Sequence, residues 1–444
     1  MKVLVVGGGI SGLAGAWEFM QLGHQVTVLE REDQIGGKLQ TRIIDGLQVE
    51  LGPDSYLRRN PLANELIDQL DLQETAPAAG RALLYDATGC QPIPTGLNLG
   101  APKSVAQALA NHLVPLPTRA RAAIGALWPD PHPTDRSDDL GLIVSRRYGR
   151  RWADANIEPL VGGINANTIY GLSALTSAPS IVTPPTGQSG GGRQGPLFAA
   201  PSAGLSALVA RLEQELTAGG CRLITSSSVQ SIERRRACDI VVATSDAIYE
   251  ANRVLVAVPA FQAAAALATA LDGDDALELL RSIHYASVSM SITFTSDTLP
   301  ARFEGISGVL VARQLGLLTT AVSIASNKWP GTIPHKATLL RISTGSLYDR
   351  RHRRMDDDEL QRTLTLEARQ ILDYDLRPQW YRIVRWERAF PHFRPYHRQI
   401  ISKLDARLRS QLHDDVILTG SYINGSGIPT CIATARERAR QMVI

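Results

Sequence analysis

The stretch KVLVVGGGISGLAGAWEFMQLGHQVTVLE, residues 2–30, joins two apolar runs through a glycine-rich turn and a helical segment. The first run, VLVV, is typical of a buried parallel strand. Gly7, Gly9 and Gly12 follow the spacing GxGxxG, which permits a tight turn, close approach of a pyrophosphate and close packing of helix on strand. Glu30 ends the second run, at the place of a carboxylate that binds a ribose hydroxyl. The stretch predicts a Rossmann-type βαβ unit and leaves NAD and FAD open as the dinucleotide.

The bulk composition is that of an ordinary globular protein. The chain has 444 residues, enough for two or three domains, with 44% hydrophobic and 20% charged residues. Its net charge of +3 is too small to indicate a nucleic-acid partner. The four cysteines lie far apart and form no CxxC motif. We therefore expect neither a metal site nor a disulfide framework, and a reducing cytoplasm fits.

No segment is apolar for long enough to predict a transmembrane helix. The longest apolar run, near AFQAAAALATAL, is about half a membrane span. Basic residues lie beside apolar ones in the predicted helical middle of the chain. We expect a cytoplasmic protein whose membrane contact is at most weak and peripheral.

The remaining sequence alternates helical and strand patterns without a visible repeat, which predicts an interrupted α/β architecture. Helical patterns cover 56–82, parts of 103–180, 204–216, 260–271 and 356–373, and strand patterns cover 221–225, 228–235, 239–244, 253–259, 286–295, 307–313, 317–325 and 337–343. A loop rich in Gly, Pro and Ser is predicted at 183–196. The expected organisation is a nucleotide domain in three parts (1–58, 201–260 and 411–444), a helical substrate-side insertion (59–200) and a substrate-binding domain (261–410).

A second glycine pair favours FAD as the dinucleotide. Residues 31–42, REDQIGGKLQTR, place Gly36 and Gly37 shortly after Glu30, followed by Lys38 and then by VELGPDSY. This order resembles the FAD-binding opening of the superfamily of amine oxidases, phytoene desaturases and protoporphyrinogen oxidases. The resemblance implies an α/β fold of the FAD-binding Rossmann type with two dinucleotide-binding domains, a mixed-sheet substrate domain and a helical insertion.

Near the end of the chain, GSYINGSGIPTCI (residues 420–432) is rich in glycine and has no His, Asp, Glu, Lys or Arg. In proteins of the superfamily, the first and last segments of the chain meet over one flavin. The resemblance therefore implies that Gly420 lies beside the isoalloxazine. It also implies that a helix beginning near Ile428 directs its positive end at the flavin N1–C2=O region. The backbone of this stretch, rather than a side chain, would be its functional part.

Further motifs occur in an order found in one branch of the superfamily. They are ELGPDSYLRRNPLANELIDQLDL, PLVGGINANTIYGLSALTSAP, APSAGLSALVARLEQEL, SNKWPGTIPHKATLLRISTG, RWERAFPHFRPYH and GSYINGSGIPTCI. Together they resemble the bacterial protoporphyrinogen/coproporphyrinogen oxidase family over nearly the whole chain, and SNKWP, LLR and RWERAFPHF are the more specific parts. The resemblance implies oxidation of coproporphyrinogen III to coproporphyrin III in haem biosynthesis. Non-covalently bound FAD would take a hydride in each of three rounds, with O2 as acceptor and hydrogen peroxide as product.

The resemblance also implies which residues form the site. Cofactor contacts are expected from Gly7, Gly9, Gly12, Glu30, Arg31, Gly37, Lys38, Gly52, Val229, Trp386, Gly420, Gly425, Ser426 and Ile428, and contacts to substrate propionates from Arg59 and Lys328. No general base is named, because flavin N5 accepts the hydride and pyrrole nitrogens can release the protons. His284, His392 and His397 have no partner at ligand spacing, so no metal site is predicted.

Two segments depart from the family pattern. Residues 165–168, NANT, lack an aromatic and an acid in a segment that borders the substrate cavity. Ile423, Asn424 and Ser426 replace residues that are commonly aromatic, acidic and Val. Two alternatives therefore stay open. One is a related flavin oxidase that acts on a different reduced heterocycle or amine in secondary metabolism, and the other is a flavoprotein that binds a tetrapyrrole without turnover. An amine oxidase would show an aromatic cage near the C-terminus, for which GSYING offers only Tyr422.

Overall fold

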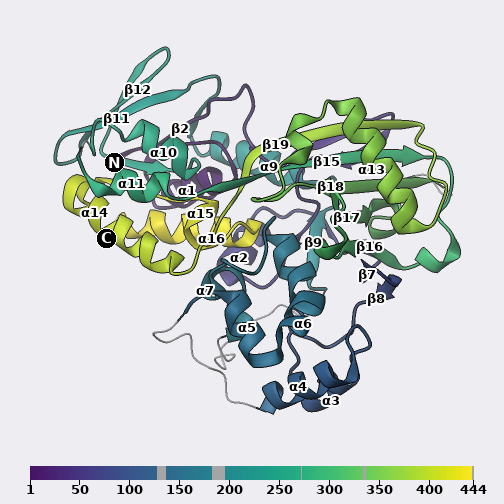
Figure 1. The fold of residues 1–444 in the computed structure, drawn as a ribbon. Coiled ribbons are helices and arrows are strands. Elements are labelled where there is room, and N and C mark those ends of the chain that lie inside the picture. Colours follow the sequence, from purple (N-terminus) through teal and green to yellow (C-terminus); the bar gives the residue numbers. More distant parts are fainter. Residues whose placement is uncertain (128–136, 183–195, 272, 334–336, 443–444) are drawn as a thin grey trace. The chain divides into compact units, whose positions relative to one another are not determined.

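The computed structural model describes residues 1–127, 137–182, 196–271, 273–333 and 337–442. The chain divides into two compact units (Figure 1). Unit 1 comprises Met1–Ala76, Gly187–His284 and Arg398–Ile444, and unit 2 comprises Pro77–Thr186 and Tyr285–His397. The loop predicted at 183–196 lies outside the described residues, apart from its last position. The division into five segments stays a prediction.

Unit 1 is built on a five-stranded parallel sheet in the order β10-β2-β1-β14-β20. Its strands are β1 (Lys2–Val6), β2 (Gln25–Leu29), β10 (Arg222–Ile224), β14 (Arg253–Val256) and β20 (Val416–Leu418). The strands read as apolar runs because a parallel sheet of this kind is covered on both faces. The first strand of the chain is central in the sheet, and the last strand is separated from it only by β14. The topology therefore brings the two ends of the chain into one sheet.

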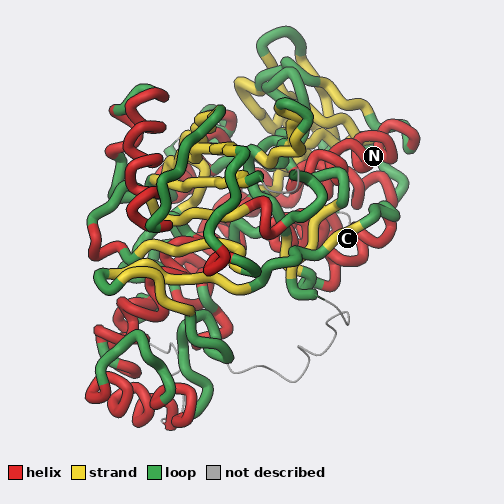
Figure 2. Tube along the Cα trace, turned by 90° about the vertical axis from the view of Figure 1, so that its right-hand side faces the viewer, coloured by secondary structure: helices red, strands yellow, loops and turns green. Residues whose placement is uncertain are grey.

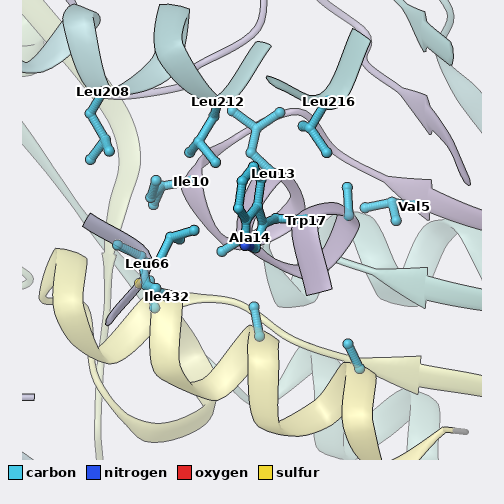
Figure 3. Close-up of a cluster of buried hydrophobic side chains, with 14 of the residues drawn as sticks. Val5, Ile10, Leu13, Ala14, Trp17, Leu66, Leu208, Leu212, Leu216 and Ile432 are labelled. Carbon is cyan, nitrogen blue, oxygen red and sulfur yellow. The ribbon is translucent and has the colours of Figure 1, made fainter. Parts of the chain in front are cut away.

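Helices from distant parts of the chain share the core of unit 1 (Figure 3). They are α1 (Ile10–Gln21), α2 (Pro61–Gln69), α9 (Leu205–Ala218) and α16 (Ile428–Gln441). Leu13 and Trp17 of α1 pack in one cluster with leucines of α9 and with Ile432 of α16. Burial of these apolar faces supplies the main free energy that holds the first and last helices together.

Smaller elements complete unit 1. A three-stranded antiparallel sheet has the order β11-β12-β13, β3 and β4 form a hairpin, and β9 pairs with both β5 and β6. The bounds are β3 (Thr41–Ile44), β4 (Leu47–Glu50), β5 (Tyr56–Leu57), β6 (Glu74–Thr75), β9 (Phe198–Pro201), β11 (Val229–Arg236), β12 (Asp239–Thr244), β13 (Ile248–Ala251), α10 (Ala260–Ala266), α11 (Asp275–Arg281), α14 (His397–Leu412), η5 (His413–Asp415) and α15 (Ser421–Asn424).

Unit 2 contains a seven-stranded mixed sheet in the order β19-β15-β18-β17-β16-β7-β8, in which only β16 and β7 pair in parallel. The strands are β7 (Arg81–Asp86), β8 (Gly89–Pro92), β15 (Tyr285–Thr295), β16 (Ile306–Val311), β17 (Thr319–Ile324), β18 (Thr338–Thr344) and β19 (Trp380–Pro391). The long helix α13 (Asp357–Leu372) buries Leu360, Leu364 and Ala368 in a cluster with residues of these strands. In Figure 2 the strands of this sheet are yellow and the helices red.

The helical part of unit 2 has its own apolar cluster, centred on Tyr148, Trp152 and Ile157. Its elements are α3 (Val105–Leu109), α4 (Leu116–Leu127), α5 (Leu140–Tyr148), α6 (Arg150–Trp152), the π-helical η1 (Ala153–Gly162), α7 (Ala174–Ser177) and α8 (Pro179–Val182). Unit 2 also contains η2 (Ala301–Phe303), η3 (Arg313–Leu315), α12 (Ala325–Lys328) and η4 (Arg351–Arg354). The mixed α/β fold expected from the sequence is confirmed, with a mixed sheet and a helical part in one unit.

The prediction of continuous helix at 56–82 is wrong. Only α2 is helical there, because Asn60 caps its first turn with hydrogen bonds from the N–H groups of Leu62 and Ala63, and the chain then turns at Asp71 with a φ of 48°. The remainder forms β5, β6 and the start of β7. Strands β7, β8 and β19 were not predicted either, whereas the helices expected at 204–216 and 356–373 are confirmed as α9 and α13.

Candidate functional site

The turn between β1 and α1 leaves backbone exposed where a ligand can approach. Gly7 has a φ of 105° and donates its N–H to the carbonyl of Leu29 at 2.8 Å. A Cβ on Gly12 would stand 1.8 Å from the carbonyl oxygen of Gly7, so α1 sits too close to the turn for any side chain there. A Cβ on Gly9, in contrast, would meet no atom within 4 Å. Gly12 is therefore required by the fold, whereas Gly9 faces open space at the N-terminus of α1.

Glu30 lies at the carboxyl end of β2, beside this turn. Its Oε2 accepts the N–H of Gly8 at 2.6 Å, and its Oε1 accepts the N–H of Glu32 at 2.9 Å. The carboxylate is thus oriented by two backbone donors and remains partly exposed. The next residue, Arg31, is an exposed side chain that pairs with Glu32, with a nitrogen–oxygen distance of 2.5 Å. The structure brings Glu30 to the glycine turn and leaves Arg31 at the surface.

The second glycine pair folds back onto the first. Gly36 donates its N–H to the carbonyl of Gly8 at 2.8 Å, and Gly37 has a φ of 59° and approaches Gly9 closely. Lys38 follows, and burial lowers the pKa of its ammonium group, although the nearby Cys431 acts in the opposite direction. A Cβ on Gly52 would stand 1.9 Å from the Lys38 carbonyl oxygen, so Gly52 supports the Lys38 backbone.

Val229 lies at the start of β11 and is half-buried. The preceding turn joins the segment after Glu30, since Ser226 donates to the carbonyl of Glu32 and Ser227 to that of Glu30, each at 2.8 Å. The backbone around Val229 is therefore next to the carboxyl end of β2. This is the side of the unit 1 sheet that carries the glycine turn.

The glycine-rich stretch near the C-terminus links β20 to α16. Gly420 and Gly425 have φ values of 132° and 139°, which side-chain-bearing residues rarely adopt. They flank the short helix α15, and Ser426 follows Gly425. Gly427 is the N-cap of α16, which begins at Ile428, and it forms no side-chain hydrogen bond. The N-cap of α1, Gly9, likewise receives no side-chain cap. The first backbone N–H groups of these two long helices therefore donate no hydrogen bond to an N-cap side chain.

The helices α1 and α16 run side by side in the same direction. Near their starts, the Ser11 hydroxyl interacts with the Cys431 thiol, whose pKa is raised by burial. Further along, Glu18 pairs with Arg436 and Arg440, with nitrogen–oxygen distances of 2.6 Å in both cases. The positive ends of both helix dipoles therefore lie together, beside the glycine turn and Lys38. Such an arrangement favours a bound anion.

Comparison with known proteins agrees with this geometry. Residues 10–443 match the family described as flavin containing amine oxidoreductase. The chain belongs to the flavin-containing amine oxidoreductases. It is 28% identical to coproporphyrinogen III oxidase of Bacillus subtilis, over 97% of this chain and 95% of that protein. It is 27% identical to coproporphyrinogen III oxidase of Mycobacterium leprae, over 97% and 96%.

A solved structure is similar over the same extent. A protein of Exiguobacterium sp., whose structure bears the name protoporphyrinogen oxidase, superposes with a TM-score of 0.86 at 25% identity, and the match covers 99% of this chain and 98% of that one. Reduced UDP-galactopyranose mutase superposes with a TM-score of 0.76 at 13% identity, which shows a shared fold. The protein is thus an oxidoreductase whose cofactor is FAD.

The residues of this flavin oxidoreductase fit FAD in unit 1. The open side of Gly9 and the uncapped N-terminus of α1 suit a diphosphate. The Glu30 carboxylate can accept hydrogen bonds from ribose hydroxyls while it keeps the hydrogen bonds from the N–H groups of Gly8 and Glu32. Gly420 and Gly425 have no side chain of their own that could obstruct a flat ring, and their φ values are ones that other residues rarely adopt.

Two predicted site residues, Trp386 and Lys328, lie in the other unit. Arg59 is an exposed residue of unit 1 just before α2, next to Arg58, which pairs with Glu74 at 2.8 Å. Trp386 and Lys328 belong to unit 2. Trp386 lies on β19 opposite Val288, and the Lys328 ammonium stands 5.7 Å from the centre of the Trp329 ring. The structure therefore groups Arg59 with the flavin residues of unit 1 and the other two with the mixed sheet.

The sequence did not indicate the buried charged group that joins α1, α2 and α16. Arg436 is 3% exposed, and besides Glu18 it donates to the Leu62 carbonyl at 2.6 Å. The available signal was Glu18 within the apolar helix LAGAWEFM, since a buried acid requires a cationic partner.

Within the described ranges, no helix has the length and apolarity needed to cross a bilayer. Among the same residues, no group of three or more His, Cys, Asp and Glu could hold a metal ion. His392 instead contacts the Gly171 carbonyl at 2.9 Å, and His397 is buried edge-on against Phe393.

Proposed function

We propose that this flavin oxidoreductase oxidises coproporphyrinogen III to coproporphyrin III in haem biosynthesis, with O2 as electron acceptor. The observation that supports this substrate is similarity over nearly the full length of relatives named coproporphyrinogen III oxidase, from two bacterial lineages. The motifs of this branch extend beyond the FAD site into unit 2, where SNKWP and LLR lie around α12 and β18. Conversion of the porphyrinogen removes six electrons and six protons, so three O2 would be reduced to three hydrogen peroxide.

The proposed roles of the chain follow from the geometry of unit 1. When bound, FAD supplies a two-electron acceptor for hydride. Gly9 and the N-terminus of α1 would hold the diphosphate, and Glu30 would orient a ribose. The N-terminus of α16 would favour negative charge on the bound group through its dipole. No side chain is assigned as proton acceptor, because the pyrrole nitrogens of the substrate and water can release protons.

The residues that depart from the family pattern have structural roles in unit 2. The Asn165 amide donates to the Val161 carbonyl at 2.8 Å, and the Thr168 hydroxyl donates to Glu158 at 3.2 Å. The Asn167 carbonyl accepts from Arg313 at 2.5 Å, and Arg313 also pairs with Glu158 at 2.8 Å. The side chains of Asn165 and Thr168 therefore form hydrogen bonds within the region around η1, and Asn167 contributes its main-chain carbonyl. Their difference from the family pattern does not by itself require another substrate.

An amine substrate has less support. Tyr422, the aromatic residue of GSYING, is 0% exposed and packs within unit 1. It is therefore not available at the surface as part of an aromatic cage around an amine. Amine oxidases of the same fold, such as a putrescine oxidase with a TM-score of 0.69 at 18% identity, share the architecture only.

Turnover in air tests the proposed function. The FAD-loaded protein should convert coproporphyrinogen III to a fluorescent porphyrin. For each porphyrin formed, three O2 should be consumed and three hydrogen peroxide produced. A rate equal to autoxidation without enzyme would contradict the proposal. Retained FAD with no turnover of porphyrinogen, but with oxidation of an amine, would move the assignment to an amine oxidase. Bound porphyrinogen that stays reduced would identify a carrier.

The setting of the reaction is part of the same proposal. We place it in the cytoplasm, with at most weak peripheral contact to membranes and no nucleic-acid partner. Co-sedimentation of the FAD-loaded protein with anionic liposomes at physiological salt would contradict that placement.

A further inference from the structure

Lys38 lies where the first turns of α1 and α16 come together. Its neighbour on α16 is Cys431, and the Cys431 thiol in turn interacts with the hydroxyl of Ser11 on α1. Ser11 and Cys431 are 6% and 5% exposed, whereas Lys38 is half-buried. A ligand can therefore reach Lys38, but only over part of its surface.

No counter-ion for Lys38 lies in the part of the chain that the structure describes, where its side chain forms neither an ion pair nor a hydrogen bond. The acids of the adjoining segments are engaged elsewhere. Glu30 accepts two backbone N–H groups beside the glycine turn, and Glu50 accepts the N–H of Leu205 at 3.0 Å. Cys431 is the titratable group that faces Lys38, and burial raises the pKa of its thiol, so the thiol is neutral at neutral pH.

An ammonium group in this position is unfavourable for two reasons. Partial burial removes water from the charge, and the positive ends of two helix dipoles repel it. Burial accordingly lowers the pKa of Lys38, although a Cys431 thiolate acts in the opposite direction. A cation that the fold disfavours and leaves without a counter-ion is expected where the counter-ion belongs to a ligand. FAD, the cofactor of this protein, carries an anionic diphosphate.

We propose that the FAD-free protein releases the Lys38 proton at a lower pH than an ordinary lysine does, and that FAD binding restores this proton. The proton comes from the buffer and is accepted by Nζ of Lys38, which then neutralises part of the negative charge of the cofactor. FAD itself keeps its charge. The inference concerns the cofactor and does not depend on which substrate is oxidised.

The consequence is that pH controls FAD affinity through Lys38. The FAD-bound protein holds one proton more than the FAD-free protein over the pH range between the two titrations of Lys38. FAD affinity must therefore fall as the pH rises through this range, by up to about tenfold per pH unit. Below the range Lys38 is charged in both states, and its contribution to FAD affinity does not change with pH.

Isothermal titration calorimetry of FAD into the FAD-free protein measures the proton directly. Titrations between about pH 7 and pH 9.5, below the ordinary lysine pKa of about 10.4, are run in two buffers whose ionisation enthalpies differ. For the wild type, the apparent binding enthalpy should differ between the buffers by the amount that uptake of up to about one proton requires. FAD affinity should fall with pH in the same titrations.

Three variants assign the proton. Lys38→Met removes the titrating group, and Lys38→Arg keeps a cation that does not lose its proton in this range. Both should bind FAD with the same enthalpy in the two buffers. Cys431→Ala removes the neighbouring thiol and should keep the uptake. The matched control is Lys403→Met, which replaces an exposed lysine of α14.

Each outcome supports or overturns the inference. Equal enthalpies in the two buffers at every pH overturn it for the wild type. Uptake that persists in both Lys38 variants, or that disappears in Cys431→Ala, also overturns it, because another group then takes the proton. If Lys38→Met does not bind FAD, Lys38→Arg alone decides. Uptake in the wild type and in Lys403→Met that is absent from the Lys38 variants supports the inference.

Discussion

Glu18 and Arg436 form a buried ion pair between the first and last long helices, with the Arg436 Nε atom 2.6 Å from Glu18 Oε2. Both side chains are almost inaccessible to water, at 6% and 3% exposure. The pair joins residues 418 positions apart in the chain. It joins α1 and α16, which run in the same direction, so that both helix N-termini lie beside the glycine turn.

Replacing Arg436 with Met should destabilise the protein and weaken FAD binding. The change leaves Glu18 buried with Arg440 as its remaining partner, and breaking a buried pair costs about 3–5 kcal/mol. Urea unfolding of the FAD-free protein measures the first effect, and FAD titration measures the second. Arg377→Met is the control, because Arg377 forms an exposed pair with Asp375 that should matter little. Equal unfolding midpoints in the two variants would contradict a structural role for the buried pair.

Stability should fall in acid through the same carboxylate. Burial alone would raise the pKa of Glu18, but hydrogen bonds and charge from Arg440 and Arg436 outweigh burial and hold the pKa below its ordinary value. The folded state therefore binds the Glu18 proton more weakly than the unfolded state does. This stabilisation is present above the unfolded pKa of about 4.3 and is lost as the pH falls through the folded pKa. Urea unfolding between pH 7 and pH 3 should show a shallower acid decline in Glu18→Gln than in wild type, and parallel declines would contradict the assignment.

Gly9→Ala and Gly12→Ala should separate cofactor binding from folding. The added methyl of Gly9→Ala meets no protein atom within 4 Å, so the FAD-free protein should keep its unfolding midpoint while FAD affinity falls. The methyl of Gly12→Ala would stand 1.8 Å from the Gly7 carbonyl oxygen, so this variant should lose stability as well. Thermal unfolding and FAD titration of both variants check the contrast. Unchanged FAD affinity in Gly9→Ala would place the diphosphate elsewhere.

Glu30→Gln should weaken FAD binding by about tenfold, because a hydrogen bond to a charged group contributes about 1.5–3 kcal/mol. The amide oxygen can still accept from the Gly8 N–H, and only the exposed bond from the Glu32 N–H is lost, so the fold should be retained. The matched control is Glu32→Gln, since Glu32 is an exposed neighbour that pairs with Arg31. If the two variants bind FAD equally well, Glu30 does not contact the ribose.

Local patterns predicted the part of the fold that local geometry determines. The glycine spacing and Glu30 are close in sequence and dictate the turn between β1 and α1, so this turn was predicted correctly, whereas its contacts to FAD stay a prediction. The C-terminal glycines were assigned through a family resemblance. Their backbone angles agree with a close approach, but their contacts to FAD stay a prediction.

Distant pairing explains what the sequence did not reveal. Strand β19 reads WYRIVRWERAFP, in which charged residues interrupt the apolar pattern, because one face bonds to α13 and the other carries Arg382. Its pairing with β15, some hundred residues earlier, cannot be read from either strand alone. The same holds for the partner of Glu18, because Arg436 resembles an ordinary charged residue of the segment ATARERARQ until the fold joins it to Glu18.

Anaerobic mixing of the FAD-loaded protein with coproporphyrinogen III shows whether this porphyrinogen reduces the flavin. The visible absorption of oxidised flavin should disappear on mixing and return when air is admitted, together with porphyrin fluorescence. Flavin absorption that stays unchanged in a protein that holds FAD would contradict the assignment of coproporphyrinogen III as the electron donor.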